Sequence, residues 1–491
     1  MGKWTRRAFI TTGVVAGGGF ALGVALRPGH RAPELASLVS KDDETLVNVW
    51  VKLDQDNVAT VIVPHSEMGQ GAQTALAQML ADEMDADWDL VQFEEAPPVS
   101  EYANYLLGYG IVGEVPKVLV PTFDGLMLTV AQSMGMQITG GSLSIRSTGQ
   151  YGMRIAGAAA REMLIEAAAE TWQVPAEEIQ TKASQLIHSA SNRRAPYAEF
   201  AAVAAQMMPP SSPKLKSADE FKIIGHDVPR RDIPSKVDGS AQFAMDVQVP
   251  GMVYATVQRA PVFGGEIAKL DVSAAKKITG VIDVVTLPSS KKEGGFSGAQ
   301  NIGETVAVVA EGYWPAKQGM DAVLVEWNNF GQDSFSSDEI FAQFDRDITA
   351  GLDRENDRLQ GDVGAAIENA TKVVEAEYRV PYLAHACMEP MNATAHVHNG
   401  ECEIWIGCQN PLGFREAVAA ALGFEPEKVT LHNYFMGGGF GRRATSDYAI
   451  QAALVAAKVQ RPVQLIWSRE EDIRQDYYRP AVRSRFRAAI D

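Results

Sequence analysis

The sequence predicts a soluble protein built from several α+β domains. Its 491 residues are enough for about three domains. A content of 46% hydrophobic and 21% charged residues is typical of a chain that folds around large cores. Strand-like runs dominate the middle of the chain, both flanking regions mix strands with helices, and no repeat period is visible.

The N-terminal segment, residues 1–36, is predicted to be an export signal. Arg6 and Arg7 precede an uncharged stretch from Ala8 to Leu26, and paired arginines before a modestly apolar stretch form the twin-arginine pattern. Glycines in this stretch weaken it as a helix and as a membrane span, which favours a signal over an anchor. Retention as an anchor stays open, because no clear cleavage site follows and Leu35-Ala36-Ser37 is the nearest. We therefore expect a periplasmic protein.

The next region, residues 41–215, is predicted to be the N-terminal part of the fold. Residues 41–63 alternate apolar and polar side chains and predict two strands. The segments Thr74 to Met84 and Met153 to Trp172 predict helices, the second because it is rich in strong helix formers. Proline and serine between residues 204 and 218 then mark a linker.

Residues 219–330 predict a domain of short strands, and residues 370–491 predict a further α+β domain. The polar, acidic stretch from Phe330 to Asn369 is expected to be a second linker with short helices. At the end of the chain, Arg483 to Ile490 predicts part of a strand or a helix. Four β-rich runs support the strand domain, at residues 252–257, 281–285, 305–310 and 322–327.

The composition excludes several classes of function. Lys and Arg number 44 against 61 Asp and Glu, and the resulting net charge of -17 disfavours a non-specific nucleic-acid binder. Cys387, Cys402 and Cys408 are too few and too irregularly spaced for a disulfide scaffold, a zinc ribbon or an iron–sulfur site. His65 and His385 lack metal-ligand spacing and are expected to be core or loop residues, so no protein-held metal is predicted.

The most informative pattern joins Gln409 to a glycine-rich loop some thirty residues later. Asn410 and Pro411 are typical of a helix start, so Asn410 is expected to cap a helix over 412–422 and to place the Gln409 amide at its mouth. Met436-Gly-Gly-Gly-Phe-Gly-Arg-Arg443 is expected to link a strand over 429–435 to a helix over 445–459. Clustered glycines let backbone amides approach an anionic or oxo ligand. A packing turn is the competing interpretation.

Two further turns have similar ingredients. Glu67-Met-Gly-Gln-Gly71 combines a tight glycine turn with an amide side chain just before a predicted helix. Gly140-Gly-Ser142-Leu-Ser144 places hydroxyls after two glycines, a combination that can surround a phosphate. Taken alone, each is also compatible with an ordinary surface loop.

Six motifs occurring together and in order resemble the molybdopterin-binding subunit of the xanthine dehydrogenase/aldehyde oxidase family. The resemblance is closest to its exported isoquinoline oxidoreductase branch and covers essentially the whole chain. The motifs are Glu67-Met-Gly-Gln-Gly, Gly140-Gly-Ser-Leu-Ser, Arg231-Asp-Ile-Pro-Ser-Lys-Val-Asp-Gly, Met388-Glu-Pro-Met-Asn, Gln409-Asn-Pro and Gly437-Gly-Gly-Phe-Gly-Arg-Arg.

The resemblance implies a multidomain α+β molybdenum hydroxylase large-subunit fold with an α/β hammerhead domain, incomplete at its C-terminus. It implies oxidation of an aldehyde or an N-heterocycle with oxygen from water, on a molybdopterin of the cytosine dinucleotide form. Gln409 and Phe440 are the residues implied in catalysis, Gln409 through a hydrogen bond to the oxo group. The residues implied in cofactor binding are Met68, Gly69, Gln70, Gly71, Ser142, Ser144, Gln409, Gly439, Phe440, Gly441 and Arg442.

Two departures from the family pattern limit the expected activity. Ala444 stands where purine-oxidising relatives carry an acidic residue, which disfavours a purine substrate. The family's catalytic glutamate, near the end of a longer chain, has no counterpart here, and Glu389 is no substitute by position. Because attack on substrate needs that base, this chain alone is expected to be inactive.

The resemblance also implies partners. These are a small [2Fe–2S] subunit and a cytochrome c as electron acceptor. The chain itself is expected to be either truncated or completed by a second polypeptide that supplies the C-terminal part. A non-catalytic remnant or pterin-binding scaffold is the alternative. An exported dehydrogenase that binds NAD through the glycine loop is a more distant third, since Gly437-x-Gly439-x-x-Arg442 lacks the third glycine of a dinucleotide fingerprint.

Overall fold

The computed structural model describes residues 31–113, 115–116, 119–292, 300–332, 336–351 and 360–490. The chain divides into two compact units, and each is discontinuous in sequence. Unit 1 comprises residues 1–250 and 392–462, and unit 2 comprises residues 251–391 and 463–491. Both units contain helices and strands, which confirms the α+β class.

Unit 1 begins with a four-stranded sheet in the order β1-β2-β3-β4. Its strands are β1 (Glu44–Asn48), β2 (Val51–Asp54), β3 (Ala59–Val63) and β4 (Val91–Glu95). Helix α4 (Ala72–Met84) connects the parallel pair β3 and β4. The prediction of two strands over 41–63 is wrong, because a tight turn divides the first of them. That turn holds no Gly or Pro and is closed by Asn48, whose Oδ1 accepts from the Trp50 N–H (3.0 Å).

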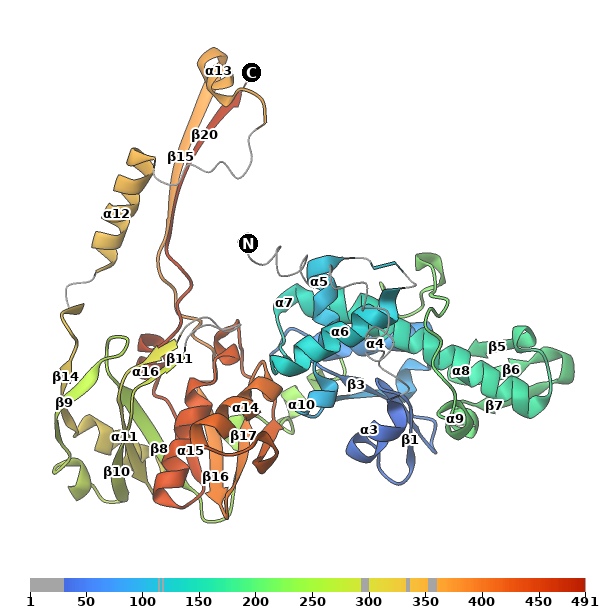
Figure 1. Cartoon of the computed structure of the whole chain (residues 1–491), viewed down its shortest axis with the longest axis horizontal. Coiled ribbons are helices and arrows are strands. Elements are labelled where there is room, and N and C mark those ends of the chain that lie inside the picture. The colour runs from blue at the N-terminus through green and yellow to red at the C-terminus, as the bar shows by residue number, and fades with distance from the viewer. Residues whose placement is uncertain are drawn as a thin grey trace, which may run out of the picture. The chain divides into compact units, whose positions relative to one another are not determined.

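Helices cover this sheet. The long α8 (Arg154–Trp172) packs on α4 (Figure 1), and Gly157 allows the close approach, since a Cβ there would lie 2.2 Å from the Leu80 carbonyl oxygen. Helix α3 (Ala32–Val39) buries Leu35 in the same core, so the last part of the predicted signal belongs to the folded unit. Residues 1–30 of that prediction lie outside the described residues. The remaining elements are α5 (Tyr109–Val112), α6 (Val120–Ser133), α7 (Gly141–Leu143), η5 (Ser144–Met153), β5 (Ile179–Lys182), β6 (Gln185–His188), β7 (Arg193–Pro196), α9 (Ala198–Ala204) and α10 (Ile233–Asp238).

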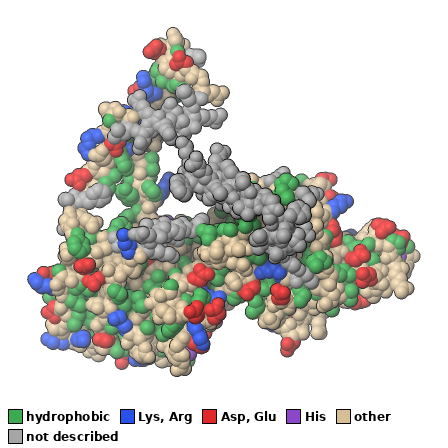
Figure 2. Space-filling view, in the orientation of Figure 1, with side chains coloured by type: hydrophobic (Ala, Val, Ile, Leu, Met, Phe, Trp, Pro, Cys, Tyr) green, Lys and Arg blue, Asp and Glu red, His purple; other side chains and the backbone are tan. Residues whose placement is uncertain are grey.

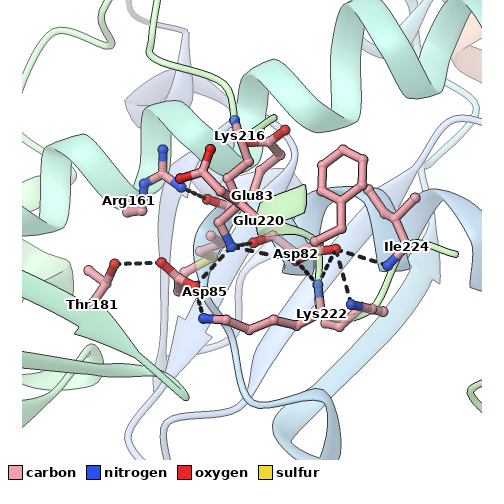
Figure 3. Close-up of polar contacts among 12 residues, drawn as sticks. Asp82, Glu83, Asp85, Arg161, Thr181, Lys216, Glu220, Lys222 and Ile224 are labelled. Atoms are coloured by element: carbon pink, nitrogen blue, oxygen red, sulfur yellow. Dashed lines mark hydrogen bonds and ion pairs between the residues drawn. The ribbon is translucent and has the colours of Figure 1, made fainter. Parts of the chain in front are cut away.

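A polar network at the end of α4 holds the predicted linker in place (Figure 3). Residues 205–217 contain no helix or strand, as predicted. The Asp82 carboxylate, however, accepts hydrogen bonds from three consecutive backbone N–H groups, those of Lys222, Ile223 and Ile224 (2.9–3.2 Å). Lys216 forms an ion pair with Asp85 (2.8 Å) beside it. The linker is therefore anchored at this end rather than loose.

We expect Asp82→Asn to lower the free energy of unfolding by about 2 kcal/mol, because an amide cannot accept three N–H bonds as a buried carboxylate does. Urea unfolding would measure the loss. The matched control is Asp89→Asn, since the Asp89 side chain is 93% exposed. Equal effects at the two positions would contradict the anchoring role.

The second part of unit 1 contributes β16 (Asn392–His398), β17 (Glu401–Ile406) and β18 (Val429–Asn433). Strands β17 and β18 are parallel and are joined by α14 (Pro411–Leu422). Helix α15 (Asp447–Val459) follows and packs on β16 and on α14 (Figure 1). The helices predicted over 412–422 and 445–459 are confirmed within two residues.

In unit 2, four strands lie in the order β10-β13-β8-β19. They are β10 (Val281–Leu287), β13 (Thr305–Ala310), β8 (Val253–Arg259) and β19 (Val463–Ile466), with α11 (Tyr313–Asp321) packed on β8 and β13. Strand β19 runs parallel to β8 although more than 200 residues separate them. The other elements are β9 (Glu266–Asp271), β11 (Ser290–Lys292), β12 (Gln300–Ile302), β14 (Leu324–Asn328), α12 (Ser337–Ala350), α13 (Val363–Asn369), β15 (Lys372–Val380), α16 (Arg469–Arg474) and β20 (Val482–Ile490).

The compact units differ from the expected domains. We expected boundaries near 215–219 and 330–370, whereas the units change at 250, 391 and 462. The reason is the long-range pairing of β19 with β8, which local composition does not reveal. The hammerhead assignment of 219–330 stays a prediction. Within the described residues, no helix is long and apolar enough to cross a membrane.

Candidate cofactor site

The glycine-rich loop between β18 and α15 has an unusual backbone. Gly438 and Gly441 have φ values of +98° and +107°, and Phe440 between them has φ +54°. A bulky residue in the left-handed region is strained, and such strain is concentrated at functional sites. The Phe440 ring is also 70% exposed, so packing of its ring does not account for this conformation. The loop therefore presents an aromatic ring at the surface of unit 1.

Gln409 joins this loop to a second segment. Its side chain is 3% exposed, its Oε1 accepts from the Gly441 N–H (3.0 Å), and its Nε2 donates to the Thr139 carbonyl (2.9 Å). Its backbone N–H donates to the Arg443 carbonyl (2.9 Å), and its carbonyl accepts from the Thr139 N–H (2.7 Å). Four hydrogen bonds thus fix Gln409 between the glycine loop and the residues that precede Gly140.

The Glu67–Gly71 turn lies against the same loop. The Met436 N–H donates to the Glu67 carbonyl (3.1 Å), and a Cβ built on Gly439 would lie 2.6 Å from Met68 Sδ and 2.8 Å from Gln409 Oε1. Only a glycine allows this contact. Gly439 is therefore the point at which three of the predicted segments meet.

Within that turn, the side chains fold back on the backbone. Gln70 Oε1 accepts from the Met68 N–H (2.7 Å), and Glu67 Oε1 accepts from the N–H groups of Gly69 and Gly71 (2.8 and 3.0 Å). Arg230 donates to the Gly69 carbonyl (3.0 Å) and pairs with Asp232. Burial would raise the pKa of Asp232, but its bonds to two cations lower that pKa to about 2. The turn is thus held rigidly, with Gly69 and Gln70 exposed.

The Gly140–Ser144 segment leads into a helix and is not the ordinary surface loop with which its sequence was also compatible. Helix α7 begins at Gly141 and continues through the π-helical η5 into α8. Because the first N–H groups of a helix lack partners, they attract anions. Ser142 is exposed in this first turn. The hydrogen bonds of Thr139 to Gln409 place this helix start beside the other segments.

The two arginines of the loop point inward. Arg442 is buried, and its guanidinium binds both carboxylate oxygens of Asp447 (3.0 Å each) and stacks over Tyr448. Arg443 donates to the carbonyls of Gly438 and Gly407 (3.0 and 3.2 Å). Both side chains therefore support the loop from behind, and the cofactor-binding role expected for Arg442 stays a prediction.

Our expectation that the Asn410 side chain caps helix α14 is wrong. Asn410 occupies the cap position of α14, but its side chain makes no hydrogen bond to that helix. Its Oδ1 instead accepts from the Gln137 N–H (2.9 Å). Asn410 thus adds a further link between Gln409 and the segment before Gly140.

Cys408 and His65 are both buried beside this cluster. Burial raises the pKa of the Cys408 thiol well above its ordinary value, and burial lowers the pKa of His65 to about 3. The neutral His65 ring bonds to Thr139 and Thr148. In the part of the chain that the structure describes, no group of His, Cys, Asp and Glu side chains is arranged to hold a metal ion.

Sequence reasoning missed Glu95. Asn433 Nδ2 and Ser66 Oγ donate to its Oε1 (2.7 and 2.8 Å), and Gln73 Nε2 donates to its Oε2 (3.2 Å). Asn433 in turn bonds to the N–H and the carbonyl of Cys408, next to Gln409. Burial raises the pKa of Glu95 to about 7, and the negative charge of Glu67 adds to the shift. Its place at the end of a parallel strand is the one sequence signal that could have indicated it.

The Glu95 shift predicts a pH dependence. Between its ordinary pKa of 4.5 and about 7, the folded protein keeps a proton that the unfolded chain has lost. Stability from this group is therefore complete below pH 4.5 and falls by about 1–3 kcal/mol as the pH rises to 7. Urea unfolding from pH 4.5 to 8 should show a flatter profile for Glu95→Gln than for the wild type. Glu471 of unit 2 also has a pKa raised to about 7 by burial, so Glu471→Gln should flatten the profile in the same way. Identical profiles for Glu95→Gln and the wild type would contradict the prediction.

Comparison with known proteins finds molybdopterin-binding relatives. Two family models, both described as molybdopterin cofactor-binding domain, match residues 10–99 and 348–491. The chain is 31% identical to the beta subunit of isoquinoline 1-oxidoreductase from Brevundimonas diminuta, over 90% of this chain and 57% of the relative. It is 30% identical to the membrane-bound aldehyde dehydrogenase [pyrroloquinoline-quinone] of Gluconacetobacter polyoxogenes, over 99% of this chain and 58% of the relative.

A third relative is a subunit of the nicotinate dehydrogenase of Pseudomonas putida, 25% identical over 86% of this chain and 32% of the relative. The chain therefore spans less than three fifths of the length of these curated relatives. The matched domains include the Glu67 turn, the Gln409 segment and the glycine loop. The chain therefore contains matches to molybdopterin cofactor-binding domains and is similar, over most of its length, to the beta subunit of isoquinoline 1-oxidoreductase.

Proposed function

We propose that this chain is the molybdopterin-binding subunit of a periplasmic molybdenum hydroxylase that oxidises an aldehyde or an N-heterocycle with oxygen from water. The observation that carries the proposal is the meeting of the Glu67 turn, the Gln409 segment and the glycine loop at Gly439. Short motifs that matched by coincidence would have no reason to be in contact.

The residues of this cluster suit a pterin with an anionic tail. A Cβ built on Gly69, Gly140 or Gly141 would meet no atom within 4 Å, so backbone can approach a ligand there. The N–H of Phe440 makes no hydrogen bond within the described residues and is available as a donor. The start of α7, with Ser142, offers N–H groups to a pyrophosphate. Gly69 and Gln70 would contact the pterin.

When bound, the molybdenum–pterin group supplies the oxygen-transfer and two-electron redox chemistry. The chain's own residues orient it. Gln409 uses one amide proton for Thr139, which leaves the second for an oxo ligand. The exposed ring of Phe440, whose backbone is strained, would border the substrate. The inward-facing Arg442 and Arg443 keep the loop from moving.

The remaining elements of the proposal come from the sequence. Activity would also need the family's catalytic glutamate, which lies outside the described residues. Electrons would leave through a small [2Fe–2S] subunit to a cytochrome c, and the cofactor would be the cytosine dinucleotide form. Twin-arginine export would deliver the folded protein to the periplasm, with anchoring if the signal is not cleaved.

A non-catalytic pterin-binding scaffold is the second candidate. A scaffold would still bind cofactor through the Gly439 cluster but would show no turnover even when its partners are present. The relative named for pyrroloquinoline quinone does not favour that cofactor here, because the domain matches are to molybdopterin.

The test is purification of the tagged chain from its native host, followed by molybdenum analysis and assays with aldehydes and N-heterocycles. The proposal expects about one molybdenum per chain and dye reduction with at least one of these substrates. A folded complex without molybdenum would overturn both candidates. Molybdenum without turnover on any substrate would favour the scaffold.

The Gln409→Ala variant tests the site itself. It removes both side-chain hydrogen bonds of Gln409, and we expect turnover to fall about 100-fold, as when one preorganised donor is removed from an active site. Gln92, exposed on β4, gives the matched control Gln92→Ala, which should keep full activity. Unchanged turnover of Gln409→Ala at full molybdenum content would exclude Gln409 from the site.

A further inference from the structure

Unit 1 contains a second pocket, the Asp124 pocket, with a volume of about 360 Å³. That volume suits a small organic ligand. Its walls come from the turn between β1 and β2, from α5, α6 and α8 (Figure 1), and from η3 (Tyr105–Gly108) and η5. None of the described residues that line it belongs to the Gly439 cluster. It is therefore a site separate from the proposed cofactor site.

Aromatic side chains form much of the wall of the Asp124 pocket. The rings of Tyr109 and Tyr151 stack with 4.5 Å between their centroids and 13° between their planes. Trp50 and Tyr105 also line the pocket. An aromatic ring offers an apolar surface, and its face attracts positive charge. Such walls therefore suit an apolar group or a cation.

Among the described residues that line this pocket, Asp124 supplies the carboxylate. The Tyr109 hydroxyl donates to its Oδ1 (2.6 Å). Within the described residues, no Lys, Arg or His forms an ion pair with it, and burial raises its pKa to about 6 against the effect of the Tyr109 hydrogen bond. Because burial removes water from a carboxylate, an opposite charge at this position would stabilise it.

The other polar groups of the wall do not supply that charge. The Arg31 guanidinium donates to the Glu101 carbonyl, and within the described residues it makes no ion pair with Asp124. The Asn48 amide is used at both ends by backbone groups (3.0 Å each). The Asp124 carboxylate is therefore left for a ligand of opposite charge.

The charge of the whole protein favours the same kind of ligand. Its net charge is -17, and acidic side chains are spread over the face that Figure 2 shows. A negative surface raises the local concentration of cations and repels anions.

We propose that the Asp124 pocket binds a small organic cation, with an ammonium group on the Asp124 carboxylate and an apolar body against the aromatic rings. A hydrogen bond between two charged groups is among the strongest polar contacts, and the rings add cation–π attraction. A neutral ligand would leave the carboxylate without an opposite charge, and an anion would be repelled by it. This inference does not rest on the proposed function, because the two sites share no described lining residue.

Three small molecules of similar shape and different charge test the proposal. At pH 8 benzylamine is a cation, benzyl alcohol is neutral and benzoate is an anion, and Asp124 is ionised because its pKa is about 6. The full chain, purified from its native host, would be titrated with each by isothermal calorimetry. We expect benzylamine to bind at least tenfold more tightly than benzyl alcohol, and benzoate to bind more weakly than either. Equal affinity for the amine and the alcohol, tighter binding of benzoate, or no binding of benzylamine would overturn the proposal.

The Asp124→Asn variant locates the bound cation. Asparagine keeps the shape of the side chain and an oxygen that can accept from Tyr109, but it lacks the charge. Affinity for benzylamine should fall at least tenfold, while affinity for benzyl alcohol should stay within twofold of the wild type. The matched control is Asp89→Asn, because the Asp89 side chain is 93% exposed, and it should bind benzylamine as the wild type does. Wild-type affinity in Asp124→Asn, or an equal loss in both variants, would contradict the site.

Calorimetry keeps this test independent of the proposed function. Binding of benzylamine is measured directly and needs neither molybdenum nor turnover. Loss of benzylamine binding in Asp124→Asn would therefore support the pocket even in a protein without molybdenum. A protein with molybdenum that does not bind benzylamine would contradict the pocket and leave the proposed function standing.

Discussion

Asp447→Ala is expected to lower the free energy of unfolding by about 3–5 kcal/mol, the largest stability effect that the structure predicts. Asp447 and Arg442 are both buried and are joined by two hydrogen bonds of 3.0 Å. Removing the carboxylate leaves the guanidinium charged inside unit 1, because arginine stays protonated. The cost is the desolvation of that unpaired charge.

A double variant provides the control. Arg442→Met with Asp447→Leu removes both charges and replaces them with apolar side chains, so it should recover most of the stability lost by Asp447→Ala. Urea unfolding followed by tryptophan fluorescence would measure all three proteins. A loss below about 1 kcal/mol for the single variant, the range of exposed pairs, would show that the pair does not support the loop.

Gly439→Ala is expected to reduce molybdenum content about 10- to 100-fold and to lower the free energy of unfolding by about 1–3 kcal/mol. The added Cβ would lie 2.6 Å from Met68 Sδ and 2.8 Å from Gln409 Oε1, and overpacking of this kind costs about 1–3 kcal/mol. The hydrogen bonds of Gln409 hold it in place, so relief of the contact would break its bond to Gly441. The geometry of the whole cluster would then change.

The backbone at Gly439 does not complicate this test. Its φ lies outside the left-handed region, so alanine introduces a contact without backbone strain. Gly364→Ala is the matched control, because its Cβ would have only an ordinary contact of 3.4 Å with Asp362. Molybdenum per chain, measured by elemental analysis, is the readout. Full molybdenum content in Gly439→Ala would show that the cluster does not hold the cofactor.

The sequence predicted the elements whose signals are local. The helices α8 and α15 have long runs of helix formers, and the strands β8, β10 and β13 have β-branched runs, so each was predicted at nearly its observed position. The motifs also predicted which turns of unit 1 lie together. In each case a short stretch of residues contains the whole signal.

The features that were not predicted depend on tertiary partners. The helix that starts at Gly141 begins among glycines that are typical of a loop. The Asn410 side chain accepts a hydrogen bond from the Gln137 N–H and does not cap its own helix. The pKa of Glu95 is raised by burial and by the charge of Glu67 and is lowered by hydrogen bonds from Ser66, Gln73 and Asn433, which come from separate segments. From the sequence alone, an arginine in a glycine-rich loop suggests a side chain that binds a ligand. In the structure the Arg442 guanidinium forms an ion pair with Asp447.

The discontinuous units have a consequence for biosynthesis. Strand β8 is made early, but its parallel neighbour β19 follows only after Ala260 to Pro462 have been translated. Unit 1 likewise cannot be completed until residues 392–462 have been translated. A nascent chain must therefore emerge past residue 462 before either unit can close, so neither unit can complete its fold while only its first segment has been made.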